Sequence, residues 1–161
     1  MVARYRFAMR ALLLILVLLG LAAAAPAADA VAGRIVKVLP FFLDQQGRDA
    51  TSPSLFDRDA YQAFLRENTN QISAVRFDVQ WKAAKAPAEK IKIALELRGV
   101  GAGSIPKLKT MEVDVVPGTF SQWTSIPLAG ADYKNFGAVV AWRATLWDGG
   151  RLLGEQKSFL W

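Results

Sequence analysis

The sequence of 161 residues contains neither histidine nor cysteine. Without histidine it lacks the commonest general base near neutral pH, the usual catalytic triad and the main nitrogen ligand of zinc. Without cysteine it can form no disulfide, no thiol nucleophile, no iron–sulfur cluster and no lipid-modified N-terminal cysteine. These two absences exclude most familiar catalytic and metal sites. They predict a protein with no catalytic residues, no cofactor and no bound metal.

Motifs for phosphate binding and for activated nucleophiles are also missing, since no GxSxG, P-loop or GxGxxG pattern occurs. Residues 99–103 are rich in glycine, but no helical pattern follows them. We therefore expect a flexible connection between strands there rather than a phosphate site. Lys and Arg are spread along the chain instead of forming one stripe, which argues against nucleic acid as a partner.

The first thirty residues have the layout of an export signal. Arg4, Arg6 and Arg10 form a basic start, and an uninterrupted apolar run covers residues 11–25. The small-x-small pattern needed by a signal peptidase follows at residues 28–30. This order of basic, apolar and small residues predicts a signal peptide.

We predict that residues 1–30 are this signal peptide, cleaved near Ala30. Residues 31–161 then form one exported domain in the periplasm or outside the cell. The alternative is a retained anchor, because the apolar stretch 7–28 is long enough to span a bilayer, and the membrane would be contacted only through it. Removing the leader leaves 17 basic and 13 acidic residues, a net charge of +4 that is ordinary for a soluble domain.

Apolar and polar residues alternate with a period of two over most of residues 31–161, which is typical of half-buried strands. Val75, Phe77, Val79 and Trp81, for example, alternate with charged and polar residues. The pattern predicts seven strands, at residues 34–43, 75–82, 91–98, 107–116, 123–128, 138–147 and 152–161.

One helix is predicted, at residues 51–68. Ser54 resembles a capping residue at its start, and Phe56, Ala60 and Phe64 form an apolar stripe at helical spacing. Residues 129–136 are expected to form a loop.

This order of elements predicts an all-β fold, an antiparallel β-sandwich of about seven strands with one short helix inserted after the first strand. An eight-stranded barrel is the alternative, since alternating strands suit it as well. Phe159, Leu160 and Trp161 end the sequence without a polar tail. We expect this apolar segment to belong to a paired strand.

Trp81 occupies an inward position in a predicted strand, and a hairpin with a glycine turn runs through residues 141–150. In these features the chain resembles immunoglobulin and fibronectin type III-like β-sandwiches over residues 34–161. It is also similar to small exported bacterial proteins of unassigned function. The resemblance is one of architecture, and the paired cysteines of antibody domains are absent. It therefore implies a fold and carries over no function.

Three groups of carboxylates are candidates for chemistry. Glu112 and Asp114 share one strand face about 7 Å apart, a separation compatible with a glycosidase pair. Asp57 and Asp59 lie in the first turn of the predicted helix, where the helix dipole favours anions. The segment 44–49 offers oxygen ligands for calcium but lacks the spacing of an EF-hand. We expect a solvated strand face, a helix start and a turn, and we keep a carboxylate-dependent hydrolase as an alternative function.

A recognition face is the remaining candidate site. Trp147 shares a strand face with Arg143, Trp123 sits among Ser and Thr, and Arg76 and Asp78 lie on the polar side of another strand. We predict a recognition face formed by these five residues. The leading hypothesis is a non-catalytic exported binding or scaffolding module that contacts a protein partner in the cell envelope. The alternative is a carbohydrate-binding module, because exposed tryptophan stacks on sugar rings.

Overall fold

The computed structural model describes residues 33–84 and 90–161. The predicted signal peptide 1–30 and its cleavage point near Ala30 lie outside the described residues. The strands are β1 (Gly33–Asp44), β2 (Ile72–Ala83), β3 (Ile91–Val100), β4 (Pro106–Val115), β5 (Gln122–Ala129), β6 (Ala138–Asp148) and β7 (Arg151–Lys157). The helices are α2 (Leu55–Glu67) and α3 (Gly130–Phe136), and the single 3-10 turns are η1 (Thr69–Gln71) and η2 (Ala102–Ser104).

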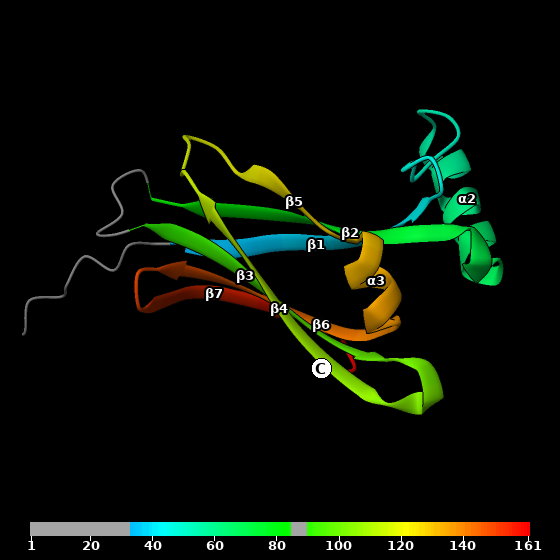
Figure 1. Cartoon of the computed structure of the whole chain (residues 1–161). Coiled ribbons are helices and arrows are strands. Elements are labelled where there is room, and N and C mark those ends of the chain that lie inside the picture. The colour runs from blue at the N-terminus through cyan, green and yellow to red at the C-terminus, as the bar shows by residue number, and fades with distance from the viewer. Residues whose placement is uncertain (1–32, 85–89) are drawn as a thin grey trace, which may run out of the picture. The chain divides into compact units, whose positions relative to one another are not determined.

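The strands form two antiparallel sheets (Figure 1). Sheet A has the order β1-β2-β5, and sheet B has the order β4-β3-β6-β7. All neighbouring strands pair antiparallel. The prediction of a mainly antiparallel β fold with seven strands and a helix after the first strand is confirmed. The described residues form two separate sheets and not the single closed sheet of the barrel alternative.

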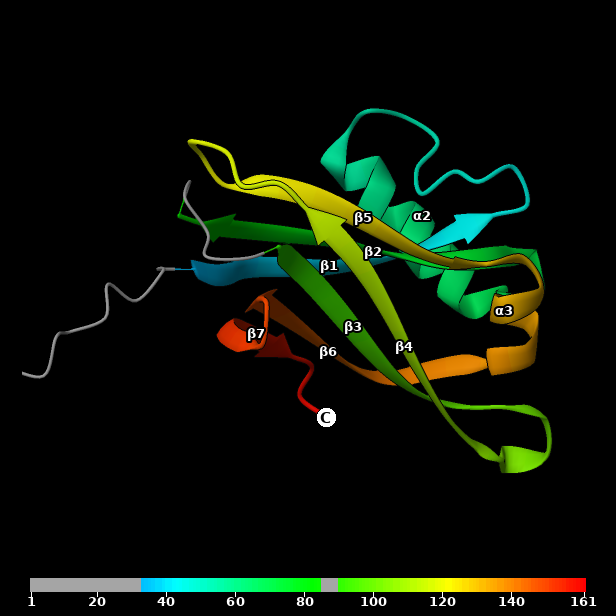
Figure 2. The same ribbon diagram turned by 60° about the vertical axis from the view of Figure 1, so that its left-hand side comes forward.

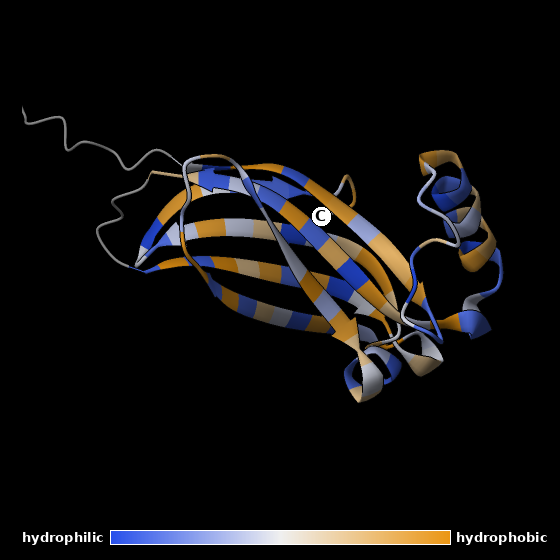
Figure 3. Cartoon of the chain, turned by 90° about the horizontal axis from the view of Figure 1, so that it is seen from above, coloured by the Kyte–Doolittle hydropathy of each residue, from blue (hydrophilic) through white to orange (hydrophobic). Residues whose placement is uncertain are grey.

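Alternate side chains of both sheets fill a common core. Phe77 and Trp81 of sheet A are buried together with Leu95 and Leu146 of sheet B. Figure 3 shows the resulting alternation of apolar and polar bands along the strands. The indole N–H of Trp81 donates to Oγ1 of Thr124 at 2.9 Å, so its burial leaves no unpaired donor. Each large apolar side chain buried in this way stabilises the fold by roughly 1.5–3 kcal/mol.

A bulge interrupts the alternation of β6. The register between β3 and β6 shifts between Arg98 and Gly99, so that Val139 packs against the core and Val140 points to solvent. Strict alternation along residues 138–147, with Ala144 and Leu146 inward, predicts Val140 inward and Val139 outward, and this prediction is wrong because of the bulge. Trp142 beyond the bulge packs at the edge of the core and stays partly exposed. One extra residue in a strand reverses the facing of every residue on one side of it.

Residues 130–136 form α3 and not the predicted loop. Phe136 is buried, and its ring lies so close to Gly99 that a methyl carbon there would come within 2.4 Å of it. Gly137 ends the helix with a φ of +83°, a conformation that favours glycine. A helix of seven residues with one buried side chain is too short for a periodic pattern to reveal. In the described part of the chain, neither helix combines the length and apolar content that crossing a membrane requires.

The end of the chain is not the paired strand that its apolar residues predict. β7 ends at Lys157, and Phe159 and Leu160 are exposed. Ser158 closes the ladder, because its N–H donates to the carbonyl of Trp142 and its Oγ accepts from the N–H of Trp142. The following residues form a turn, in which the N–H of Trp161 donates to the carbonyl of Ser158.

The two sheets approach each other most closely along a seam between β1 and β7. A methyl carbon on Gly154 would lie 2.9 Å from Cα of Arg34, and one on Gly33 would lie 2.7 Å from the Leu153 side chain. A side chain at either point would require its neighbours to move, so the two strands are in close contact where β1 begins. These contacts place β7 beside the beginning of β1. β7 ends three residues after Gly154, at Lys157, whereas β1 continues to Asp44, so the second half of β1 extends beyond β7.

Candidate functional site

The five residues of the predicted recognition face lie on two different sheets. Arg76 and Asp78 on β2 and Trp123 on β5 belong to sheet A. Arg143 and Trp147 on β6 belong to sheet B. The structure therefore brings together two smaller groups and does not assemble all five in one place.

Arg76 is the centre of a hydrogen-bonded cluster on the outer face of sheet A. Its guanidinium donates to both oxygens of Asp78, at 2.9 and 3.0 Å, and to Asp49 at 3.3 Å. Ser125 on β5 donates to Asp78 at 2.6 Å, and the Arg76 guanidinium lies 5.7 Å from the ring centre of Phe41. The two carboxylates are mostly covered, and the single positive charge of Arg76 offsets one of their two negative charges. This group connects β1, β2 and β5, and its polar atoms are bonded to one another.

Trp123 is the more exposed of the two tryptophans in the predicted recognition face, with 51% of its surface open to solvent. It lies directly across from Gln80 in the β2–β5 pair, and the Gln80 amide reaches Ser121 at 3.4 Å. An open indole beside an amide group can stack on a ligand ring and offer hydrogen bonds at its edge.

Arg143 and Glu96 form the central ion pair on the outer face of sheet B. They are cross-strand neighbours, and Nη2 of Arg143 lies 2.7 and 2.8 Å from the two Glu96 oxygens. Glu155 on β7 adds a third charge at 3.7 Å from Arg143. Opposite charges placed directly across two neighbouring antiparallel strands in this way stabilise the sheet.

Trp161 covers this ion pair from the chain end. Its ring lies 4.1 Å from the Arg98 guanidinium and 5.0 Å from that of Arg143. Both are cation–π contacts, each worth about 0.5–1 kcal/mol at a partly exposed site. Sequence reasoning missed Trp161 as a surface residue because it assigned the chain end to a strand.

Trp147 is half-buried rather than fully exposed. Its indole N–H donates to Oγ1 of Thr145 at 2.8 Å, and Thr145 is itself buried and donates to the carbonyl of Ala94. The polar group of this indole is therefore already occupied within the fold, unlike the indole of Trp123, for which the described residues provide no such acceptor.

The strand-face carboxylates are paired with lysines. Glu112 accepts from Lys92 at 3.0 and 3.1 Å, and Asp114 lies 3.9 Å from Lys90. Within the residues that the structure describes, no three carboxylates gather as a metal site would require. These contacts are those of a solvated strand face.

The carboxylate of Asp44, at the end of β1, is buried and surrounded by donors. It accepts from the backbone N–H groups of Gln46 and Arg48, from the Arg48 guanidinium and from the Tyr61 hydroxyl, all within 2.8–2.9 Å. Burial by itself raises the pKa of Asp44, but the hydrogen bonds outweigh it and lower this pKa to about 2. The same bond to Asp44, aided by burial, raises the pKa of Tyr61. The donors make this loop a closed turn and not a calcium loop.

The α2 helix is fastened to the free edge of β1 by the side chain of Gln62. Its Oε1 accepts from the N–H of Phe42 at 2.8 Å, and its Nε2 donates to the carbonyls of Phe42 and Asp49 at 2.9 Å. Leu65, one turn further on, is completely buried. Figures 1 and 2 both show α2 beside the end of sheet A, at the far side from the beginning of β1. The helix is thereby held in one orientation.

The opposite side of α2 is apolar and open to solvent. Phe56 is 80% exposed, and Leu55 and Phe64 are also exposed, with Ala60 and Ala63 between them. We name Phe56, Ala60, Ala63 and Phe64 the α2 stripe. The same spacing in the sequence normally marks a core-facing helix side, yet here Tyr61, Gln62 and Leu65 face the protein instead.

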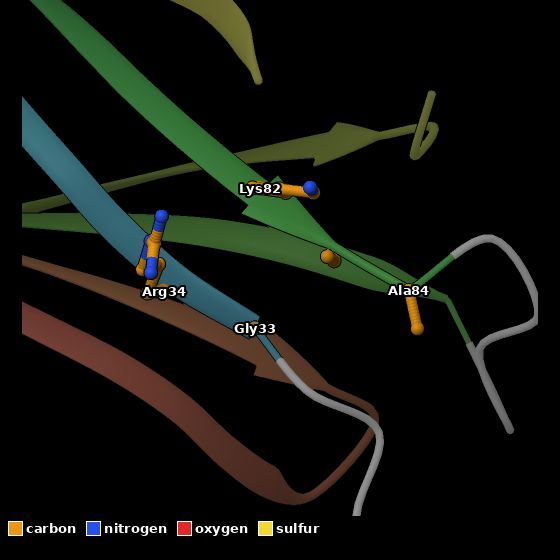
Figure 4. Close-up of a pocket in the computed structure, with 5 residues that line it drawn as sticks. Gly33, Arg34, Lys82 and Ala84 are labelled. Carbon is orange, nitrogen blue, oxygen red and sulfur yellow. The ribbon is translucent and has the colours of Figure 1, made fainter. Parts of the chain in front are cut away.

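A surface pocket lies where β1 begins and β2 ends (Figure 4). Gly33, Arg34, Lys82, Ala83 and Ala84 line it, and the two cationic side chains stand at its rim. No residue of the predicted recognition face belongs to its described lining.

The sequence matches no protein-family model, and no curated protein matches it. The assignment of a function therefore rests on the surfaces and contacts described above.

Proposed function

We propose that this protein is an exported, non-catalytic binding module with an immunoglobulin-like β-sandwich fold, and that it binds a protein partner in the cell envelope through the α2 stripe. The two antiparallel sheets support the sandwich fold, and the export-like order of residues 1–30 supports a location in the cell envelope. The partner is a protein with an apolar groove that accepts one face of a helix.

The exposed α2 stripe is the observation that carries this proposal. Soluble proteins seldom leave contiguous apolar side chains on a short helix open to water unless a partner covers them. Asp57, Asp59 and Glu67 are exposed around the stripe. The groove that fits it is therefore apolar inside and basic at its rim, because opposite charges around an interface favour its correct register.

The anchoring of α2 also suits this role. The bonds of Gln62 to β1 and of Tyr61 to Asp44 fix the helix before any partner arrives. A partner then spends little free energy on ordering the helix, and more of the contact energy appears as affinity.

Co-purification from the cell envelope of the source organism tests the proposal. Replacing Phe56 and Phe64 each by Asp should remove the partner, because a carboxylate buried in an apolar groove costs several kcal/mol. Leu108→Asp is a matched control, since Leu108 is 79% exposed but lies on β4, outside the stripe. The proposal fails if the same protein is recovered at equal yield with the stripe variants and with the control, or if no protein is recovered in a saturable way.

A carbohydrate-binding role through Trp123 is the second candidate. Its open indole and the neighbouring Gln80 amide support this alternative. Tryptophan fluorescence titration with a panel of glycans should then show a saturable change that disappears in Trp123→Ala and persists in Trp147→Phe. Identical titrations of the two variants would exclude Trp123 as the site.

A further inference from the structure

A cavity of about 210 Å³ lies between the two sheets at the open end of the β1–β7 seam. Its walls are mostly apolar and include Phe42, Phe77, Val139 and Trp142. Arg66 from α2 and Ser158 from the end of the chain supply the polar lining. We name this space the seam cavity.

The topology explains why the seam cavity is not filled. β7 ends at Lys157 and does not reach the part of β1 that contains Phe42. Pro40 carries no N–H, and both backbone groups of Phe42 are taken by Gln62, so this edge of β1 needs no further strand to satisfy it. The bulge that turns Val139 inward and Val140 outward gives the opposite wall an irregular shape.

Arg66 supplies a cationic group at the edge of the seam cavity. Four of the eight arginines in residues 33–84 and 90–161 have a carboxylate partner within 4 Å, namely Arg48, Arg76, Arg143 and Arg151. The side chain of Arg66 makes no hydrogen bond and no ion pair with any residue in 33–84 or 90–161. An arginine at the edge of an apolar cavity is suited to an anion whose remaining part is apolar.

We propose that the seam cavity binds a single unbranched aliphatic chain that carries a carboxylate. The chain occupies the apolar space between Phe42, Phe77 and Trp142, and the carboxylate lies on Arg66. The Ser158 hydroxyl, which accepts from the N–H of Trp142, keeps its own proton to donate to the same carboxylate. None of the lining residues belongs to the α2 stripe, so this site does not depend on the proposed protein partner.

The size of the cavity narrows the class of ligand. Pockets for drug-sized molecules enclose about 300–1,000 Å³, and the seam cavity is smaller. It excludes sterols and other fused rings, and its apolar walls offer few partners for the hydroxyl groups of a sugar. A flexible aliphatic chain of modest length fits both the volume and the apolar walls of the cavity.

Isothermal titration calorimetry of the full chain with saturated carboxylates tests the proposal. The ligands run from butanoate to dodecanoate, all below their micellar concentrations. Affinity should rise by up to about fourfold for each added methylene, the change expected for full burial. It should then level off once the cavity is full. A rise that continues along the whole series would indicate adsorption to an open surface and would overturn the proposal.

Substitutions distinguish binding of the ligand carboxylate from binding of its aliphatic chain. Arg66→Gln should weaken octanoate binding about tenfold and leave octanol unchanged, since only the charged bond is lost. Arg34→Gln is the matched control, because Arg34 is also exposed and without an ion pair among the described residues, at the opposite end of β1. Val139→Phe should fill the cavity and abolish binding of both ligands. Circular dichroism establishes that this variant is folded, and Arg66→Gln serves alone if it is not.

Binding that survives Arg66→Gln unchanged would overturn the proposal, as would the absence of saturable binding for every chain length. Ligand bound to the apolar leader would survive Arg66→Gln, because neither Arg66→Gln nor Val139→Phe alters the leader. A parallel titration with dioctanoyl phosphatidylglycerol shows whether a phospholipid supplies the anionic chain instead of a free carboxylate. The Arg66 dependence is expected with whichever of the two sources binds.

Discussion

The hydroxyl group of Tyr61 on α2 donates a hydrogen bond of 2.8 Å to the carboxylate of Asp44 at the end of β1. Asp44 is buried there and also accepts from two backbone N–H groups of the following turn. One carboxylate thus closes the turn after β1 and holds the helix that returns to it. The orientation of the α2 stripe depends on this pair and on Gln62.

The first prediction concerns stability in acid. The pKa of Asp44 is about 2 in the fold against an ordinary value of 3.8, so the folded state binds this proton more weakly than the unfolded state. The stabilising contribution is complete above about pH 5, amounts to about 2 kcal/mol, and is lost progressively as the pH falls through 3.8 toward the folded pKa of about 2. Urea unfolding between pH 2 and pH 7 measures it.

Asp44→Asn should flatten this part of the pH profile and lower the free energy of unfolding at pH 7. Glu112→Gln is the control, because Glu112 is exposed and bonded only to Lys92 among the described residues. If Asp44→Asn retains the acid-dependent loss in full, another group is responsible for it.

The second prediction concerns Gln62. Gln62→Leu leaves the N–H and the carbonyl of Phe42 without their side-chain partners, and each unpaired buried group costs about 1–3 kcal/mol. We expect a clear drop in the midpoint of chemical unfolding. Gln71→Leu, on the exposed turn after α2, should leave the free energy of unfolding within about 0.5 kcal/mol of the parent. Equal midpoints for the two variants would contradict the anchoring role of Gln62.

Much of the sheet structure could be predicted from the sequence, because period-two alternation is local. The alternate apolar residues face the core as the pattern indicates, namely Val75, Phe77, Val79 and Trp81 in β2 and Ile91, Ile93, Leu95 and Leu97 in β3. The pattern fails at Val139 and Val140, where one extra residue in β6 changes the facing. A bulge is determined by the pairing of two strands far apart in the chain, so one strand alone does not reveal it.

The candidate site was less predictable for a related reason. Alternation shows that Arg76 and Arg143 lie on polar strand faces, but not which strands are neighbours. Likewise, the spacing of Phe56 and Phe64 shows that they share a side of a helix but not that this side faces water. The outcome for α2 depends on Gln62 reaching β1, a contact between residues 20 positions apart.

The third prediction concerns the closed end of the seam. Gly154→Ala places a methyl carbon 2.9 Å from the Arg34 backbone, which must move to accommodate it. We expect destabilisation of about 1–3 kcal/mol, as for other overpacked sites. Gly150→Ala is the matched control, since no atom lies within 4 Å of its added carbon. A Gly154→Ala protein as stable as this control would contradict the close approach of β1 and β7.

The fourth prediction concerns Trp161. Trp161→Ala removes the ring from the Arg98 and Arg143 guanidinium groups and should lower the free energy of unfolding by about 1 kcal/mol. Arg98→Gln should reproduce about half of this loss. Phe159→Ala should have no effect, because Phe159 is fully exposed. Equal losses for Trp161→Ala and Phe159→Ala would mean that the stacking contributes nothing specific.

Site-specific photo-crosslinking in the cell envelope of the source organism tests the central claim most directly. A photoreactive phenylalanine derivative replaces Phe56 in one strain and Leu108 in another, two positions of nearly equal exposure, at 80% and 79%. The account predicts one discrete adduct from position 56, lost when Phe64 is changed to Asp, and no such adduct from position 108. The same products from both positions, or none from position 56, would contradict a partner-binding role for the α2 stripe.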